Sequence, residues 1–207
     1  MKFSLPFCFL LLAACNGSTP TNPVSENPVK KDTAVVPVQM QNPFAPVDIS
    51  PMDVCYFPVD FPVQKMTKKL STPPVMRVLY SRPHRQGRRI FGALVHYGEP
   101  WRLGANEASE IELFQSVTIQ DKKIEKGRYI IYCIPYSDHW TIIFNSNIYS
   151  WGLKPDPQQD KYKFDVPVQP TASPIEYFTM VFEKLDDKNT NLLMAWDEVV
   201  VRLPIKV

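Results

Sequence analysis

Hydrophobic and polar residues alternate with a period of two along most of the chain after residue 70. Such alternation is typical of strands that bury one face. It occurs in Val75 to Tyr80, Glu110 to Phe114, Val117 to Ile119, Arg128 to Ile134, His139 to Asn145, Tyr162 to Val168, the run from Phe178 to Phe182, Asn191 to Trp196, and Val199 to Ile205. Turn residues separate these runs, and none has a clear helical period. The pattern predicts an all-β fold, an antiparallel β-sandwich of about 8–10 strands.

The composition changes twice before this domain. Residues 15–50 are rich in Pro, Ser, Thr, Asn and Val, and such a segment cannot bury enough apolar surface to offset the entropy of ordering. We therefore expect a disordered, Pro-rich tether there. Residues 51–70 keep the prolines but gain Tyr56, Phe57 and Phe61, which indicates an irregular, extended arm packed on the domain, with these aromatics partly buried. The β-sandwich domain is assigned to residues 71–207.

The first fifteen residues have the features of an export signal. Lys2 is followed by an apolar run, Phe3 to Leu12, that is too short to span a bilayer, and then by Leu12-Ala13-Ala14-Cys15. This resembles a bacterial lipoprotein signal peptide with its lipobox. The resemblance implies that residues 1–14 are removed and that Cys15 is lipidated. The alternatives are an ordinary secretory signal with a chance cysteine, and a signal anchor.

The expected location follows from this signal. Asn16 stands where an aspartate would indicate retention in the inner membrane, so the sequence favours the outer membrane, with the domain facing the periplasm. Acyl chains contribute about 0.8 kcal/mol per buried methylene, so several chains would hold the protein on the membrane without a transmembrane helix. The membrane is therefore an expected partner through the lipid anchor.

The net charge bears on the expected binding partners, and the cysteine content bears on disulfide formation. The formal net charge of +2 over 207 residues gives no electrostatic argument for nucleic acid, and we expect none as a partner. Cys8 would leave with the signal peptide and Cys15 would be acylated, so two cysteines remain, Cys55 and Cys133. A disulfide between them and two unpaired thiols both stay open.

The segment from Tyr80 to Phe114 differs from the strands around it. It holds four of the seven glycines, two of the three histidines and five arginines. Turn-forming and polar residues joined to a regular scaffold are where binding or catalytic residues are expected. The sequence therefore predicts the functional site in this segment.

Four neighbouring residues in this segment are the first candidates for binding a small polar ligand. Arg102 offers a planar fork of donors for a carboxylate or phosphate, Trp101 offers a flat face for a sugar or aromatic ring, and Asn106 can both donate and accept. Glu107 is the fourth candidate. In the alternative interpretation Arg102 pairs with a nearby glutamate (Glu107, Glu110 or Glu112), Asn106 fixes the loop backbone and Trp101 caps the core.

A basic run containing Arg82, His84 and Arg88 is the second candidate, as a site for an anion. Its alternative is a solvated loop. We predict no metal site and no cofactor, because no HxH, HExxH or CxxC spacing and no phosphate-binding loop occurs.

Three function classes stay open. We favour a non-enzymatic envelope module that binds a small polar ligand or an envelope partner. A hydrolase-type enzyme acting on envelope material, with His84 or His96 and Glu107 as an acid–base pair, is one alternative. A purely structural domain is the other.

Several motifs follow one another along the chain: Ser81-Arg82-Pro83, Gly87-Arg88, Ile90-Phe91-Gly92, Tyr97-Gly98, the run Trp101 to Glu107, Lys126 to Tyr129, Ile134-Pro135, Trp140 to Ile143, and Trp151-Gly152. In these motifs the chain resembles a bacterial family, domain of unknown function 2911 (DUF2911), from about Pro51 to the C-terminus. The resemblance implies an exported protein or lipoprotein, in agreement with the role expected for Cys15. It implies no particular activity.

Overall fold

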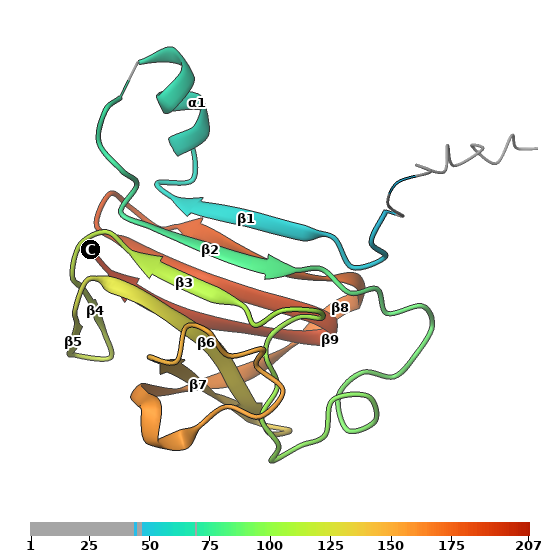
Figure 1. The fold of residues 1–207 in the computed structure, drawn as a ribbon. Coiled ribbons are helices and arrows are strands. Elements are labelled where there is room, and N and C mark those ends of the chain that lie inside the picture. The colour runs from blue at the N-terminus through green and yellow to red at the C-terminus, as the bar shows by residue number, and fades with distance from the viewer. Residues whose placement is uncertain (1–43, 45–46, 69) are drawn as a thin grey trace, which may run out of the picture. The chain divides into compact units, whose positions relative to one another are not determined.

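The computed structural model describes residues 44, 47–68 and 70–207 (Figure 1). The predicted signal peptide, the predicted lipidation site Cys15 and most of the predicted tether lie outside the described residues. The secondary structure is β1 (Met52–Phe57), α1 (Phe61–Thr67), β2 (Met76–Ser81), β3 (Glu110–Leu113), β4 (Val117–Ile119), β5 (Lys122–Ile124), β6 (Gly127–Pro135), β7 (His139–Asn145), a 3-10 helix (Pro157–Gln159), β8 (Asp160–Lys184) and β9 (Asn189–Lys206).

These strands form one open antiparallel sheet in the order β1-β2-β3-β6-β7-β8-β9-β4-β5. Every neighbouring pair is antiparallel. The prediction of a mostly β, antiparallel fold is therefore confirmed. The hydrogen bonds do not divide the strands into the two separate sheets of the predicted sandwich, because β8 and β9 connect both parts of the strand order.

The long strand β8 explains this difference. Its first part pairs with β7, from Asp160 to Pro167, and its second part pairs with β9, from Val168 to Lys184, with register shifts on either side of Ile175. Prolines cannot donate a ladder hydrogen bond, and Pro170 and Pro174 lie near the shifts. The same prolines made the sequence look like two strands with a loop between them.

The sheet bends so that strands distant in its order pack against each other. The Tyr80 ring of β2 meets Phe178 of β8 edge-on, with centroids 5.8 Å apart, and Phe57 of β1 meets Phe182 of β8 at 6.1 Å. In Figure 1, β8 and β9 pass behind β1 to β3. These aromatic rings belong to one hydrophobic core, and each large apolar side chain buried there contributes roughly 1.5–3 kcal/mol.

Residues 51–70 are more regular than the predicted arm. Met52 to Phe57 pair with Ser81 to Met76, so the extended part is an edge strand of the sheet. Phe57 is buried, and Tyr56 and Phe61 are half-buried, as the aromatic content indicated. The helix α1 follows and buries none of its residues.

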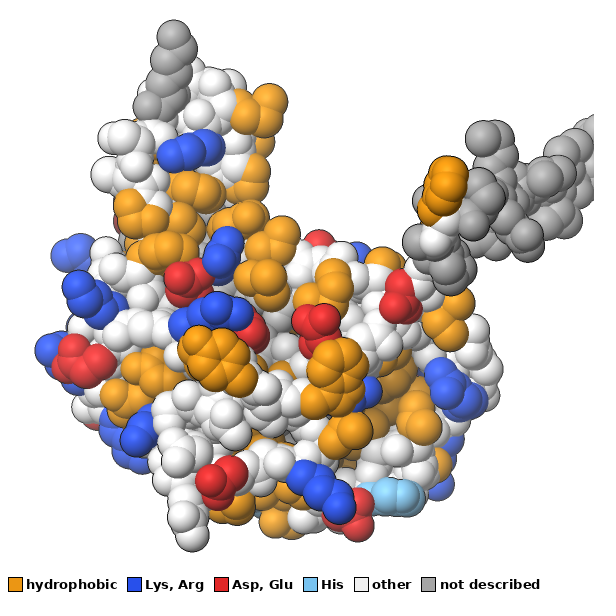
Figure 2. Space-filling model, in the orientation of Figure 1, with side chains coloured by type: hydrophobic (Ala, Val, Ile, Leu, Met, Phe, Trp, Pro, Cys, Tyr) orange, Lys and Arg blue, Asp and Glu red, His pale blue; other side chains and the backbone are white. Residues whose placement is uncertain are grey.

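Two further observations bear on the sequence-based expectations. Cys55 and Cys133 are both free thiols. Neither described helix has the length and apolar character needed to cross a membrane. Figure 2 shows basic, acidic and apolar side chains interspersed over the visible face. This face therefore has no extended patch of one charge.

Candidate functional site

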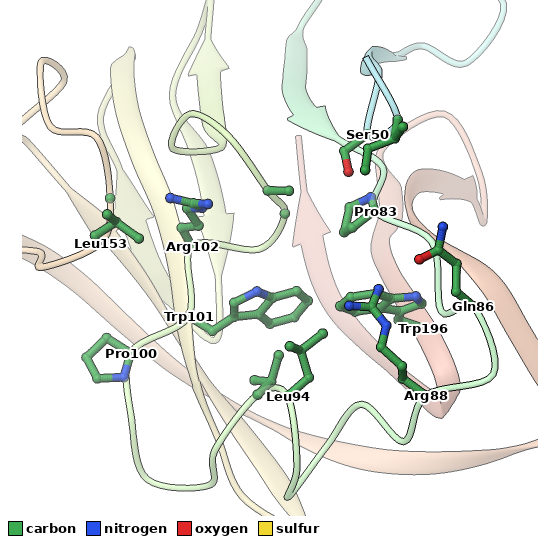
Figure 3. A pocket seen from close by; sticks show the side chains of 15 residues that line it. Ser50, Pro83, Gln86, Arg88, Leu94, Pro100, Trp101, Arg102, Leu153 and Trp196 are labelled. Atoms are coloured by element: carbon green, nitrogen blue, oxygen red, sulfur yellow. The ribbon is translucent and has the colours of Figure 1, made fainter. Parts of the chain in front are cut away.

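A cavity of about 360 Å³ lies against the loop that joins β2 to β3 (Figure 3). Ligand pockets commonly measure about 300–1,000 Å³, so a small molecule can be accommodated. Most of the lining comes from the loop itself. The rest comes from residues 49–50 ahead of β1, residues 152–153 after β7, and Trp196 of β9.

Backbone hydrogen bonds to β6 position the loop. The Trp101 N–H donates to the Cys133 carbonyl at 2.8 Å, and the Trp101 carbonyl accepts from the Cys133 N–H at 2.9 Å. Gly98 N–H donates to the Pro135 carbonyl at 2.8 Å. The loop therefore runs along the end of β6, which places the Trp101 side chain next to the core.

Two tryptophans form the floor of the cavity. The rings of Trp101 and Trp196 stack with centroids 5.7 Å apart and an interplanar angle of 19°. Trp101 also meets Trp140 and Phe178 edge-on, at 5.7 and 4.9 Å. The indole N–H of Trp196 donates to the Glu176 carbonyl at 3.2 Å. These contacts fix both rings, so the floor is preformed.

Arg102 stands at one side of this floor (Figure 3). Its Nη1 atom is buried and has no hydrogen-bond partner among the described residues. Partial burial lowers the pKa of the guanidinium, because the charged form has lost part of its water and no described carboxylate replaces it. The ion pair with a neighbouring glutamate, which the sequence left open, does not form.

The nearby glutamates pair with other arginines. Glu110 holds Arg128 through two hydrogen bonds of 2.6 and 2.8 Å, and Glu112 accepts from Arg77 at 2.7 Å. Glu107 is exposed and makes no hydrogen bond or ion pair with the described residues. Arg102 therefore has no acidic partner among the described residues.

Gly152 allows the chain to pack closely against Arg102. Its φ of +82° suits glycine, and a Cβ atom there would lie 2.8 Å from the Ala108 Cβ and 3.1 Å from the Arg102 Cβ. Any larger residue would push this wall of the cavity away from Arg102.

Arg88 reaches the cavity from another part of the loop. Its Nε donates to the Arg85 carbonyl at 3.0 Å and its Nη2 to the His84 carbonyl at 2.6 Å. These bonds hold the guanidinium on its own turn. Its Nη1 has no hydrogen-bond partner among the described residues, and the side chain lines the cavity.

Asp197 fastens this part of the loop to β9. One carboxylate oxygen accepts from Arg85 Nε at 2.5 Å, and the other accepts from the Ile90 N–H at 3.1 Å. Asp197 is only 7% exposed and has a positive φ of 53°, a conformation that Asp and Asn tolerate better than most residues. Asp197 was not among the predicted site residues, because it lies between two predicted strand runs and far along the chain from the loop.

Two predicted site residues, Arg82 and His84, lie outside the cavity lining. Arg82 pairs with Asp53 at 3.1 Å and lies over the Tyr177 ring at 5.8 Å. The His84 ring packs on the same tyrosine, with centroids 4.1 Å apart. Both side chains attach the start of the loop to the surface of β8.

Asn106 and Glu107 are not in the lining either. The Asn106 amide donates to Asp48 Oδ2 at 2.7 Å and more weakly to the Ser50 carbonyl at 3.4 Å. It therefore ties residues 48–50 to the loop, close to the role that the alternative interpretation gave it. Of the seven predicted ligand-binding residues, the cavity brings together Arg88, Trp101 and Arg102.

Among the residues that the structure describes, no histidine, aspartate or glutamate lines this cavity. The acid–base pair that a hydrolase would need, His84 or His96 with Glu107, is therefore not part of it. Among residues 44, 47–68 and 70–207, no group of three or more His, Cys, Asp or Glu side chains could hold a metal ion.

Several lining residues had no signal in the sequence. Trp196 belongs to a regular strand run, and Ile49 and Ser50 belong to a segment expected to be disordered. Gly152 and Leu153 lie 48 or more residues along the chain from Gly104, which lines the same cavity. Only the fold shows that these side chains converge.

The fold and the cavity define a class of protein: a mostly β domain on one open nine-stranded sheet, with a cationic cavity over a tryptophan floor. Residues 62–205 match the family model described as "Protein of unknown function (DUF2911)", and the chain belongs to this family. No curated protein and no solved structure matches the chain.

Proposed function

We propose that this domain is a non-enzymatic binding module that holds a small anionic ligand in the cavity above Trp101 and Trp196. The observation that carries the proposal is the buried, unpartnered Nη1 of Arg102. Guanidinium groups bind carboxylates and phosphates through paired, charge-assisted hydrogen bonds. An anion in the cavity would supply the partner that the protein lacks.

The cost of leaving the Arg102 nitrogen without a partner supports the same function. A buried polar group without a partner costs roughly 1–3 kcal/mol of stability, so it is retained at a cost unless something binds it. The aromatic floor can hold the flat face of a sugar or an aromatic ring. The site thus combines one strong polar contact with a rigid apolar surface, as small-molecule sites generally do.

The proposal includes a location in the cell envelope. The lipobox ending at Cys15 supports a lipoprotein held at the outer membrane and facing the periplasm. The anionic group would then belong to a small molecule of that compartment or to an exposed group of an envelope partner.

Calorimetric titration with matched charged and neutral compounds tests the proposal. Benzoate and phenyl phosphate supply the anion, and benzamide and phenol are their uncharged counterparts. We expect only the anions to bind. Arg102→Met should weaken their binding by at least about tenfold, which corresponds to roughly 1.4 kcal/mol.

Arg128→Met is the matched control, because Arg128 is an arginine on β6 that is already paired with Glu110. It should bind the anions like the unmodified protein. Arg102→Lys, which keeps the charge but loses the fork, provides a second variant should Arg102→Met fold poorly. Equal binding of neutral and charged compounds, or unchanged binding by both Arg102 variants, would refute the proposal.

A further inference from the structure

We infer that the natural ligand carries two separate anionic groups on a flat apolar or aromatic body, one bound by Arg102 and the other by Arg88. This inference rests on the function proposed above, and it specifies the chemical class of the ligand. It comes from the distribution of charge around the cavity.

The two guanidinium groups approach the cavity from different sides. Figure 3 shows Arg102 beside Trp101 and the end of the Arg88 side chain at Trp196, the other of the paired indoles. Arg102 directly follows Trp101, whose backbone pairs with β6. Arg88 lies on a turn that is attached to β8, because the Arg85 N–H donates to the Glu176 carbonyl at 2.7 Å. The two charges are therefore held by separate parts of the sheet.

The described part of the cavity lining contains both arginines and no acidic side chain. The other polar side chains among its residues, Ser50 and Gln86, are neutral. Arg88 is exposed to solvent and Arg102 is partly buried, and neither has an acidic partner among the described residues. A ligand with two anionic groups would give each of them a counter-charge.

The arginines on either side of Arg88 in the sequence do not share this excess of positive charge. Arg85 and Arg89 line a second hollow of about 270 Å³, which also contains Asp197 and Glu198. There two cations face two carboxylates, and Arg85 is directly paired with Asp197 at 2.5 Å. Arg88, between them in the sequence, faces a lining with no carboxylate.

The surface between the two cations is apolar. Trp101 and Trp196 form the floor, and Pro83 and Leu94 lie beside it. Such a surface would bind an uncharged, flat body and leave its charged ends to the arginines. The expected ligand is thus polar at both ends and apolar in the middle.

Titrations with rigid aromatic dicarboxylates test this inference. Isophthalate, terephthalate and biphenyl-4,4′-dicarboxylate present two carboxylates at three separations, and benzoate presents one. We expect at least one dicarboxylate to bind about tenfold or more tightly than benzoate, because it gains a second charge-assisted contact. In Arg88→Met this gain should disappear, so that the preferred dicarboxylate binds that variant no more tightly than benzoate does.

Arg89→Met is the matched control, because Arg89 is adjacent in sequence but lines the other hollow. It should keep the preference for the dicarboxylate. The amide 4-carbamoylbenzoate, which has the shape of terephthalate and a single charge, separates the effect of charge from that of size. It should bind no more tightly than benzoate if terephthalate is the preferred compound.

The outcomes distinguish the two proposals. If benzoate binds through Arg102, but no dicarboxylate binds more tightly and Arg88→Met changes nothing, the two-anion inference is wrong and the proposed function stands. If the gain from a second carboxylate survives in Arg88→Met, the assignment to Arg88 is wrong. If neither benzoate, phenyl phosphate nor any dicarboxylate binds, both proposals fail.

Discussion

Arg102 and Arg128 are arginines with opposite surroundings in the same domain. Arg128 makes a two-pronged pair with Glu110, and this raises the pKa of its guanidinium. Burial lowers the pKa of Arg102, and its Nη1 has no partner. The described residues therefore supply no counter-ion for Arg102.

Replacing Arg102 should consequently stabilise the ligand-free protein. In Arg102→Met the unpartnered donor is removed and most of the side-chain volume is kept, so we expect the free energy of unfolding to rise by about 1 kcal/mol. Urea unfolding at neutral pH measures the change. In Arg128→Met, which loses an exposed ion pair, it should fall by about 0–1 kcal/mol. A loss of stability in Arg102→Met would show that Arg102 stabilises the free protein.

The sequence predicted the types of residue at the site but not their partners. Trp101 and Arg102 stood out because flexible glycines flank a flat ring and a forked cation. Which glutamate would neutralise Arg102 depended on strand register, and register places Glu112 directly opposite Arg77. Arg102 therefore lacks a glutamate partner because of the strand register, and its local sequence does not show this.

At the scale of elements, the loop between β2 and β3 is held on β9 by a single carboxylate. Asp197 bonds to Arg85 through one oxygen and to the Ile90 N–H through the other. Its positive φ turns it out of the regular strand pattern toward the loop. The position of Arg88 thus depends on a residue far along the chain.

Asp197→Asn should weaken this attachment without changing the backbone conformation, since Asn tolerates positive φ. The substitution leaves Arg85 without its counter-ion in a largely buried place, so the free energy of unfolding should fall by about 2–3 kcal/mol. Thermal or urea unfolding measures this, and Asp138→Asn, at an exposed aspartate, is the control. A change of less than about 0.5 kcal/mol would contradict the anchoring role.

Alternation predicted most strands well, because a half-buried strand must alternate to keep one face in the core. It failed where another requirement dominated. Lys122 and Lys123 lie between two predicted strand runs, yet they belong to the exposed strand β5, whose only buried residue is Ile124. The prolines around Phe61 hid the helix α1, although Pro62 lies in its first turn, where a missing N–H costs little.

At the scale of the whole molecule, the core encloses ionisable side chains in their neutral forms. Burial raises the pKa of Tyr80 to about 12, and the carboxylate of Asp53 adds to this effect. Burial also raises the pKa of Tyr129 to about 12, with Tyr162 contributing, and the pKa of the Cys55 thiol to about 12. Because of these raised pKa values, the free energy of unfolding depends on pH in the alkaline range.

The free energy of unfolding should fall as the pH rises from about 9 to 12. In this range the unfolded chain releases protons at the ordinary pKa values, about 8.5 for Cys and 10 for Tyr, while the folded protein retains them. Below the unfolded values both states are protonated, so these groups cause no pH dependence there. Urea unfolding at pH 8, 9, 10 and 11 measures the slope.

Tyr80→Phe provides the comparison, because phenylalanine does not ionise. Its stability should decline less steeply between pH 10 and 11 than that of the unmodified protein, whatever its stability at pH 8. Parallel curves for the two proteins would show that Tyr80 is not responsible for the alkaline loss.

Ile49 and Ser50 form a second wall of the cavity, in addition to the one at Gly152, and the way this wall is attached has a mechanical consequence. Asn106 holds this wall through its bonds to Asp48 and the Ser50 carbonyl, and the β1–β2 ladder begins only afterwards along the chain. A force that pulls the chain from its N-terminal side reaches the Asn106 bonds before it reaches that ladder. Such tension would peel the wall from the cavity while the sheet stays whole, and a bound molecule touching the wall would resist the peeling.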